Sequence, residues 1–503
     1  MINSAWSQNN VVRAYGGYAN DLLYSVDTDP AGNIIVGGIT GSFLVNTEQF
    51  AGWLMQLDAN GDTLWSRSYL SDAEQTEFRH VMYTSDGGIL ATGFRFWQGG
   101  VVLKTDAFGI PEWTLGSNAT RNFKTADATL EDGFYIAGSH NSGNNSNIDV
   151  FKVDDLGTLI WGVTFDTGYE DIVYDITTTP DSGAIVVGST RSTGTYTDGL
   201  VFKLDKNGAL EWNKAIGNQN PDRLDHVINL SQGGYLTVGR LAGQTTTAYR
   251  PLLVALNNSG DTTWTNIVGV GGGSSIIETS SGFVMTMDLV GGGQYSDHTL
   301  AFLTPTAQLV STHTYGSTES EGSWNFKQLP DGRFVIVGIT EGAGQGDTDG
   351  FISIVNGDGS SQCEGDPLPL GGFFNTPTLT TVGSITPSIS LISGSLPTQA
   401  LKHPLITDFC NTTNIERTND EEAAILAHFD ASLNSVVLTI PANIEQFKFV
   451  DIIDIIGRSV HTATINDCCT MVIPVAQLAR GTYIIQVIDG RRDDRRSTRV
   501  VLN

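Results

Sequence analysis

Three aspartates recur in the first half of the chain, each ahead of a short apolar segment that we expect to be a strand. They are Asp21, Asp171 and Asp225. A ring of carboxylates at one mouth of a closed fold could bind a cation, or a sugar through its hydroxyl groups. The alternative is that each carboxylate caps backbone N–H groups of its own loop, which is a common role of aspartate in turns.

Aromatic residues form a second group of candidates. Phe96, Trp97 and Tyr249 lie in segments that we expect to be long loops between strands. Aromatic side chains on loops held by a rigid scaffold are frequent contact residues in binding proteins. The alternative is that they cover the small cores of these loops.

Motifs for nucleophilic or metal chemistry do not occur in the sequence. It contains no H-E-x-x-H, G-x-S-x-G or C-x-x-C pattern. The turn "DANGD" at 58–62 carries three oxygen-bearing side chains, but its counterparts "DAFGI" and "DDLGT" lose them, so a calcium loop is not supported. We therefore expect no metal, no cofactor and no catalytic residue.

The charge of the chain excludes one class of partner. The formal net charge is −27, from 54 acidic and 27 basic residues. Because phosphate recognition needs a basic surface, we expect no nucleic-acid partner. No uninterrupted apolar run is long enough for a membrane span, so none is expected.

The elements that position these residues repeat along the chain. One marker is a turn followed by tryptophan, at Trp65, Trp113, Trp161, Trp212 and Trp264. The other is a short apolar run that closes on glycine, at Gly37, Gly93, Gly138, Gly188, Gly239 and Gly338, with a degenerate copy near Met287. Together they define seven copies, each with four short strands, which is typical of a β-propeller.

The ends of the repeat predict how the ring closes. The seventh copy stops near residue 359 without a fourth strand, whereas "NVVRAYGG" at 10–17 resembles the end of that strand in other copies. We therefore expect Val11–Tyr15 to complete the last blade by pairing near residues 351–355, which would leave no open edge in the ring. The tryptophan of each copy is expected to fill the gap between adjacent blades.

The four cysteines all lie after the repeats. Cys363 and Cys410 bound a segment rich in serine, threonine, proline and glycine, and a disulfide between them is expected if the protein is exported. The alternative is two free thiols. The adjacent Cys468 and Cys469 lie further on, and their redox state is left open.

The end of the chain resembles a known family. The segments "VDIIDIIGRSV" and "IPVAQLARGTYIIQVIDG" look like the type A C-terminal sorting domain of the type IX secretion system of Bacteroidetes, with Gly457, Leu478, Gly481 and Tyr483 at matching positions. The propeller copies also resemble repeats common in such secreted proteins. The resemblance implies recognition by the secretion machinery, export across the outer membrane, and release or attachment at the cell surface.

The turns of the repeat also resemble those of an enzyme family. The D-x-N-G-x-x-x-W turns are similar to the tryptophan-docking repeats of quinoprotein dehydrogenases. That family has eight copies rather than seven, and its adjacent cysteines lie against the cofactor, whereas Cys468 and Cys469 lie outside the repeats.

The predicted architecture is all-β, with a seven-bladed β-propeller and a small sandwich-like sorting domain. Residues 1–7 are either a signal-peptide remnant or an ordinary disordered N-terminus. We expect 8–360 to be the propeller, 361–424 the cysteine-bounded segment with a linker, and 425–503 the sorting domain. We expect a secreted or surface-exposed, non-catalytic module that binds a glycan or a protein, or has a structural role. The alternative is a secreted propeller enzyme, a hydrolase or lyase acting on polysaccharide, since propellers host both classes.

Overall fold

The computed structural model divides the chain into two compact units, 1–411 and 412–503, each described here by itself. In the first unit it describes residues 10–43, 50–69, 75–96, 99–117, 121–142, 145–191, 194–218, 220–242, 249–269, 271–288, 298–316, 320–341, 348–361, 378–380, 384–387, 392–394 and 405–408. In the second it describes 426–430, 435–440, 447–454, 459–464, 469–475, 478, 481–489 and 495–502. Among all these residues, no helix has the length and apolar character needed to cross a membrane.

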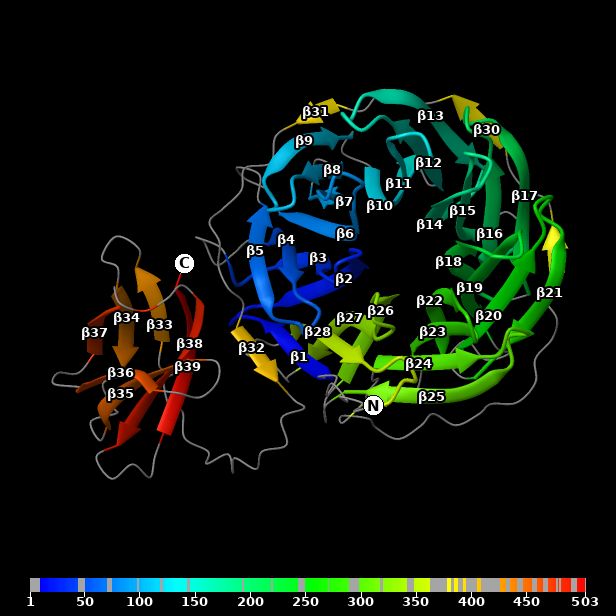
Figure 1. Cartoon of the computed structure of the whole chain (residues 1–503). Coiled ribbons are helices and arrows are strands. Elements are labelled where there is room, and N and C mark those ends of the chain that lie inside the picture. Colours follow the sequence, from blue (N-terminus) through cyan, green and yellow to red (C-terminus); the bar gives the residue numbers. More distant parts are fainter. Residues whose placement is uncertain are drawn as a thin grey trace. The chain divides into compact units, whose positions relative to one another are not determined.

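Seven antiparallel sheets form a closed ring in the first unit, which confirms the predicted seven-bladed propeller (Figure 1). The inner strands are β2 (Asp21–Thr28), β6 (Thr76–Tyr83), β10 (Arg121–Ala128), β14 (Asp171–Thr178), β18 (Arg223–Asn229), β22 (Gly272–Thr279) and β26 (Ser320–Gln328). The second strands are β3 (Ile34–Thr40), β7 (Ile89–Arg95), β11 (Phe134–Ser142), β15 (Ala184–Thr190), β19 (Tyr235–Ala242), β23 (Gly282–Asp288) and β27 (Phe334–Glu341).

The outer half of each blade completes the pattern. The third strands are β4 (Ala51–Leu57), β8 (Gly99–Thr105), β12 (Asn145–Val153), β16 (Asp198–Leu204), β20 (Tyr249–Leu256), β24 (His298–Leu303) and β28 (Thr348–Val355). The fourth strands are β5 (Thr63–Tyr69), β9 (Pro111–Gly116), β13 (Leu159–Asp166), β17 (Leu210–Gly217), β21 (Thr262–Ile267), β25 (Leu309–Tyr315) and, for the seventh blade, β1 (Val11–Gly16).

The core is a ring of apolar clusters, one at each junction between neighbouring blades. Each sheet is therefore covered on both faces, and strands such as β3 and β15 are buried along their whole length. This accounts for runs such as "AIVVGST", which lack the alternation of a half-exposed strand.

The recurring tryptophans connect each blade to the next. The Nε1 atoms of Trp113, Trp161 and Trp212 donate to backbone carbonyls in the turn of the following blade, at 2.9, 3.0 and 3.0 Å. The glycine of each receiving turn lies against the indole ring. The predicted position of the tryptophans between blades is confirmed. The turn and the tryptophan recur together because the tryptophan of one blade contacts the turn of the next.

This contact gives a testable prediction for Gly260. Its φ is +78°, and a Cβ built on it would lie 2.5 Å from Cδ2 of Trp212. Gly260→Ala should lower the free energy of unfolding by about 1–2 kcal/mol for the left-handed backbone and by a further 1–3 kcal/mol or so for overpacking. Gly233→Ala is the matched control, because Gly233 has φ +90° and no atom within 4 Å of such a Cβ. Guanidinium denaturation of the two variants should separate the cost of overpacking from the cost of the left-handed backbone. Equal denaturation midpoints would contradict the contact between Gly260 and Trp212.

The predicted closure of the ring is confirmed. Strand β1 pairs antiparallel with β28, with Val11 opposite Ile354 and Tyr15 opposite Gly350. The Tyr15 hydroxyl also donates to the Gly61 carbonyl of the first blade at 2.6 Å. The N-terminal strand thus joins the last blade to the first.

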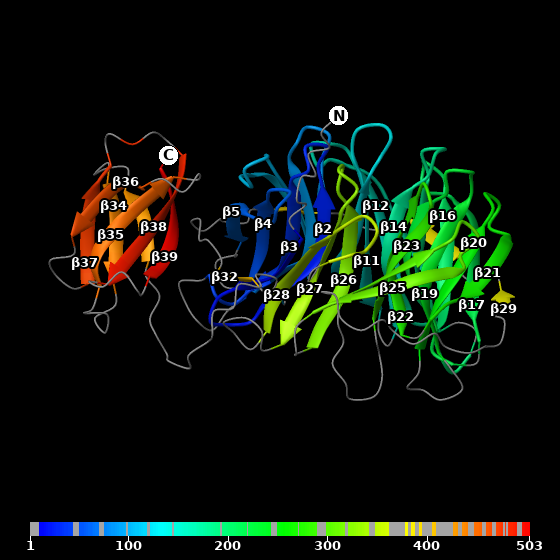
Figure 2. The ribbon, with the colours of Figure 1, turned by 60° about the horizontal axis from the view of Figure 1, so that its bottom comes forward.

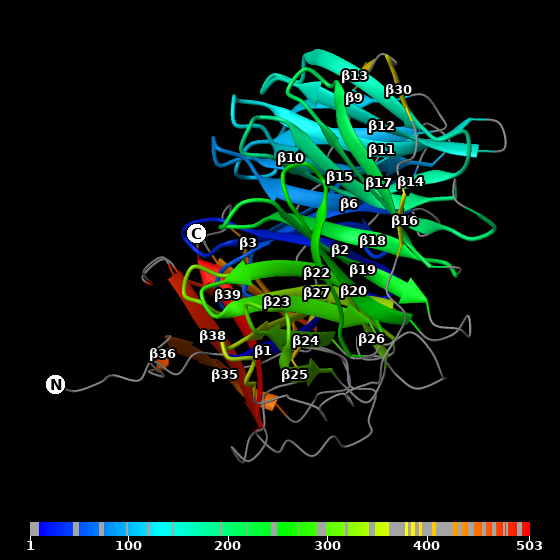
Figure 3. The same ribbon diagram turned by 90° about the vertical axis from the view of Figure 1, so that its right-hand side faces the viewer.

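Four short strands after the repeats lie at the circumference, an arrangement that the sequence did not predict. They are β29 (Thr378–Thr380), β30 (Ser384–Pro387), β31 (Ile392–Gly394) and β32 (Leu405–Asp408), and they pair with β17, β13, β9 and β1 respectively. In Figure 1 they lie along the outside of the ring, and Figure 3 shows β30 beside β13. The segment therefore runs backwards past the blades and covers four outer edges that would otherwise be open to pairing.

The second unit consists of two sheets (Figure 2). One contains β33 (Leu426–Asp430), β34 (Ser435–Ile440) and β37 (Cys469–Pro474); the other contains β35 (Phe447–Asp454), β36 (Ser459–Thr464), β38 (Gly481–Asp489) and β39 (Arg495–Leu502). Val436 and Ile473 of the first sheet share a buried cluster with Val450 and Ile485 of the second. The two sheets therefore pack face to face as a small sandwich.

Candidate functional site

Every inner strand of the propeller carries a β-bulge at the same place. The residues left out of the pairing are Tyr24, Arg79, Lys124, Tyr174, Asp225, Ser274 and Trp324. A bulge inserts one residue and re-aims its side chain, and bulges are common beside functional sites. Here all seven bulged residues line one cavity in the central channel.

The bulge also explains the glycine that closes each repeat. In the second blade Gly93 pairs with Phe78, just before the bulge, and a Cβ on Gly93 would lie 1.8 Å from the Glu77 carbonyl oxygen. The same close approach occurs in five other blades. In the first blade the residue in this place is Gly38 rather than the predicted Gly37. The glycine marker was thus a sequence signal for the bulges, and it was not recognised as one.

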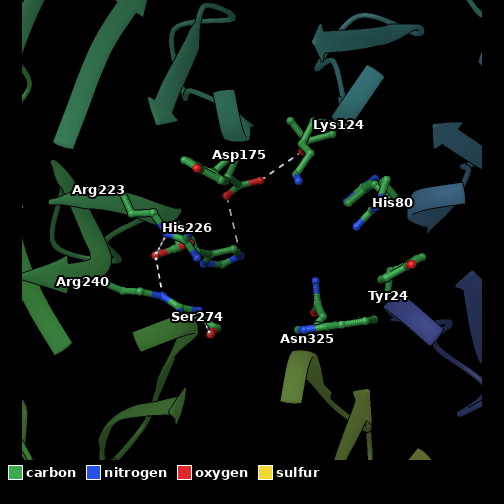
Figure 4. Close-up of a pocket in the computed structure, with 14 residues that line it drawn as sticks. Tyr24, His80, Lys124, Asp175, Arg223, His226, Arg240, Ser274 and Asn325 are labelled. Atoms are coloured by element: carbon green, nitrogen blue, oxygen red, sulfur yellow. Dashed lines mark hydrogen bonds and ion pairs between the residues drawn. The ribbon is translucent and has the colours of Figure 1, made fainter. Parts of the chain in front are cut away.

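The cavity has a volume of about 260 Å³ (Figure 4). Besides the bulged residues, its lining includes His80, Asp175, His226 and Arg240. Water reaches it, because the side chains of Arg79 and Arg223 are 30% and 33% exposed. Ligand pockets commonly measure roughly 300–1,000 Å³, so this one suits a small ligand or one end of a longer one.

One wall of the channel is an aromatic and cationic stack. The rings of Tyr24 and Trp324 are stacked with centroids 4.4 Å apart, and the guanidinium of Arg79 lies 4.1 Å from the Tyr24 centroid. Arg79 is also ion-paired with Glu77. Burial raises the pKa of the Glu77 carboxyl, and Arg79 opposes that increase.

The wall supplied by the fifth blade is a charged network. Asp225 Oδ1 lies 2.9 Å from Arg223 Nε, and Asp225 Oδ2 lies 3.5 Å from Arg240 Nε. The Arg223 guanidinium also lies 4.7 Å from the centroid of the Tyr174 ring. One carboxylate thus serves two arginines, which leaves an excess of positive charge on this wall.

Lys124 lies among these groups, and no carboxylate or carbonyl among the described residues accepts a hydrogen bond from it. Its Nζ is 5.6 Å from the centroid of the Tyr174 ring. Burial lowers the pKa of the Lys124 ammonium to about 8, with Arg79 and Arg223 adding to the decrease. The ammonium therefore lies in an enclosed and electrostatically unfavourable position.

A second layer of polar groups follows Lys124 along the channel. Burial lowers the pKa of His80 to about 4 and that of His226 to about 3, so both rings are neutral near pH 7. Asp175 accepts hydrogen bonds from Val227 N at 3.0 Å and Thr125 Oγ1 at 3.1 Å, and burial raises its pKa to about 6. His226 Nδ1 likewise accepts a hydrogen bond from Ile276 N at 3.4 Å, so Asp175 and His226 are both bonded within the protein as well as lining the cavity.

The predicted carboxylate ring needs one correction. Asp21 and Asp171 are the first residues of their inner strands, fully buried, and each accepts from the backbone N–H four residues earlier, Gly17 at 2.8 Å and Thr167 at 2.8 Å. Asp225 does not precede its strand but lies inside β18, and Asp222 takes the equivalent place, accepting from Asn218 N at 2.5 Å. Of the three predicted aspartates, only Asp225 lines the cavity.

The buried position of Asp222 predicts a pH effect on stability. Burial raises its pKa to about 7, above the ordinary value of 3.8, so the folded state holds this proton more tightly than the unfolded state. Its stabilising contribution is complete below pH 4 and is lost as the pH rises through about 7. Asp222→Asn removes this dependence, so its melting temperature relative to wild type should be higher at pH 8 than at pH 5. Asp205→Asn is the control, since the pKa of Asp205 is lowered and its charge is constant over this range; equal pH responses would contradict the assignment.

Two of the predicted loop aromatics, Phe96 and Tyr249, lie apart from the channel lining. Phe96 follows β7, is 36% exposed, and packs against Phe94 with centroids 5.0 Å apart. Tyr249 is the first residue of β20 rather than part of a loop, and it pairs with Ala242. Trp97 lies outside the described residues. A contact surface formed by these three residues stays a prediction.

The sorting-domain positions and the cysteines are partly described. Tyr483 is buried in the core of the sandwich, Leu478 packs against that core, and Gly481 begins β38. Cys469 begins β37. Gly457, Cys363, Cys410 and Cys468 lie outside the described residues, so the predicted disulfide stays a prediction. Within the part of the chain that the structure covers, no group of three His, Cys, Asp or Glu residues could hold a metal ion.

Comparison with known proteins defines the class of the second unit. Residues 434–502 match the secretion system C-terminal sorting domain. No curated protein matches the sequence. The chain thus carries the sorting domain of type IX secretion, interacts with that machinery, and is secreted or displayed at the cell surface.

The solved structures that match this chain share little sequence with it. The match to Sqt1 from Chaetomium thermophilum has 11% sequence identity and a TM-score of 0.40, and it covers 70% of this chain and 100% of the Sqt1 chain. Dihydro-heme d1 dehydrogenase NirN is 12% identical over 76% of this chain and 82% of its own, with a TM-score of 0.38. PorZ, a surface component of the type IX secretion system of Porphyromonas gingivalis, is 12% identical over 97% of this chain and 75% of its own, with a TM-score of 0.34.

Proposed function

We propose that this exported propeller is a non-catalytic binding protein that receives its ligand in the central channel. One observation carries the proposal. The same bulge in seven inner strands directs seven side chains into one cavity, and these side chains differ sharply in chemistry, whereas the residue before the bulge is buried and apolar in five of the seven strands. Leu23, Phe78 and Phe123 precede the bulge and are all buried and apolar.

The chemistry of the lining favours binding over turnover. Catalysis by acid–base or nucleophilic groups needs several of them to converge on one reacting atom. Here Asp225 is shared by two arginines, and Asp175 accepts two hydrogen bonds from the protein. His80 and His226 are neutral near pH 7 and have a low pKa, which makes them weak bases.

A glycan array run beside a hydrolase and lyase panel tests this proposal on the full chain. We expect a set of bound glycans and no turnover. Trp324→Ala should weaken binding about tenfold or more, because aromatic side chains in a pocket commonly contribute over 1 kcal/mol. Tyr169→Ala is the control, since Tyr169 is 54% exposed and outside the lining.

Turnover that is lost on changing Asp175 or Asp225 to Asn would replace this proposal with the enzyme alternative. Binding that Tyr169→Ala removes and Trp324→Ala leaves intact would move the site away from the channel.

A further inference from the structure

The channel concentrates positive charge in a chain whose net charge is −27. Arg79 comes from the second blade, Lys124 from the third, and Arg223 and Arg240 from the fifth. Among the described lining residues and their ion pairs, three carboxylates, those of Glu77, Asp175 and Asp225, lie with these four cations. The described residues of the site therefore hold one more cation than carboxylates, in a chain that is strongly acidic as a whole.

The placement of these cations is unfavourable when the channel holds only water. Burial lowers the pKa of the Lys124 ammonium, the like charges of Arg79 and Arg223 lower it further, and Asp225 and Glu77 act in the opposite direction. The arginines are held in place: Arg79 over Tyr24 and paired with Glu77, and Arg223 over Tyr174 and paired with Asp225. Lys124 has the Tyr174 ring at 5.6 Å but no acceptor among the described residues.

A group with negative charge would relieve this repulsion and supply the missing acceptor. Carboxylate and sulfate oxygens accept charge-assisted hydrogen bonds from ammonium and guanidinium groups, and these bonds are stronger than neutral ones. The neighbouring aromatic residues offer apolar surface for the rest of a ligand, as is usual in sites that combine a few polar anchors with aromatic walls.

We infer that the channel binds an anionic saccharide group, a uronate carboxylate or a sugar sulfate, with Lys124 Nζ as its anchor between Arg79 and Arg223. This inference rests on the proposed binding function and narrows it to one ligand class.

Titration of the full chain with three probes tests the inference: D-glucuronate, inorganic sulfate, and D-glucose as the neutral counterpart of glucuronate. We expect saturable binding of glucuronate, of sulfate or of both, and none of glucose over the same range. Comparison of the two anions distinguishes a carboxylate site from a sulfate site.

Lys124→Met should weaken anion binding about 10- to 100-fold, the usual effect of losing a hydrogen bond to a charged group. Lys124→Arg should restore most of it. Lys206→Met is the control, since Lys206 is exposed in a turn outside the channel lining. Should Lys124→Met fail to fold, titrations of the wild-type protein and of Lys124→Arg still test whether the channel binds an anion.

The inference is overturned if neither anion binds, or if Lys124→Met and Lys206→Met bind them equally. Its failure is distinguishable from failure of the proposed function. The protein could bind neutral glycans on the array in a way that Trp324→Ala weakens and Lys124→Met does not. The channel would then still be the binding site, but its ligand class would differ from the one inferred here.

Discussion

Tyr15→Ala should destabilise the propeller by about 3–5 kcal/mol, the usual cost of truncating a large buried aromatic residue. The side chain is fully buried at the junction of the last and first blades, and its hydroxyl donates to Gly61 O at 2.6 Å. Deleting residues 1–16 should have a still larger effect, because it removes the whole fourth strand of the seventh blade and exposes the edges of both β28 and β32. Urea denaturation followed by tryptophan fluorescence measures both effects.

The matched control is Tyr18→Ala, three residues further along the chain. Tyr18 is 82% exposed, so its truncation should change the free energy of unfolding by no more than about 0.5 kcal/mol. A deletion variant that unfolds cooperatively at the wild-type midpoint would show that β1 does not close the ring.

Export should be lost completely when the chain ends at residue 411. Residues 434–502 match the secretion system sorting domain, and the contacts within the chain separate residues 412–503 as a compact unit. Full-length and truncated chains, each behind the same functional signal peptide in a Bacteroidetes host with type IX secretion, should differ in location. We expect the full chain at the surface or in the medium and the truncated chain in the periplasm.

Two controls make this result interpretable. The truncated chain in the periplasm should resist mild proteolysis, which shows that the propeller has folded and is retained rather than degraded. Tyr483→Phe should be exported normally, because it keeps the buried ring in the core of the sandwich. Equal export of the truncated chain would contradict the assignment of the sorting function to the second unit.

The repeat could be predicted because the local turns and the packing between blades depend on the same recurring residues. Four turn glycines, at positions 109, 157, 208 and 260, each lie against the tryptophan of the preceding blade, so one contact requires the same two residue types in successive repeats. The ring closure could be predicted for the same reason, since Val11–Tyr15 carries the ending of a fourth strand and the seventh copy lacks one.

The channel was missed because a bulge breaks the alternation on which strand predictions rest. A bulge adds one residue, so the side chains after it face the direction opposite to the one that simple alternation predicts. The equivalent aspartate lies three residues before the bulged residue in all three blades, and in the fifth blade that residue is Asp222 rather than Asp225. The strands at the circumference were missed for another reason: β29 and β31 have only 3 residues each, too few to show any period.

A crystal structure of the full chain with the strongest ligand from the glycan array would show whether the ligand binds in the central channel. We predict ligand density inside the channel, in contact with Lys124 and at least one of the other bulged residues. Density confined to the outer loops near Phe96 and Tyr249, with the channel holding only water, would contradict this prediction.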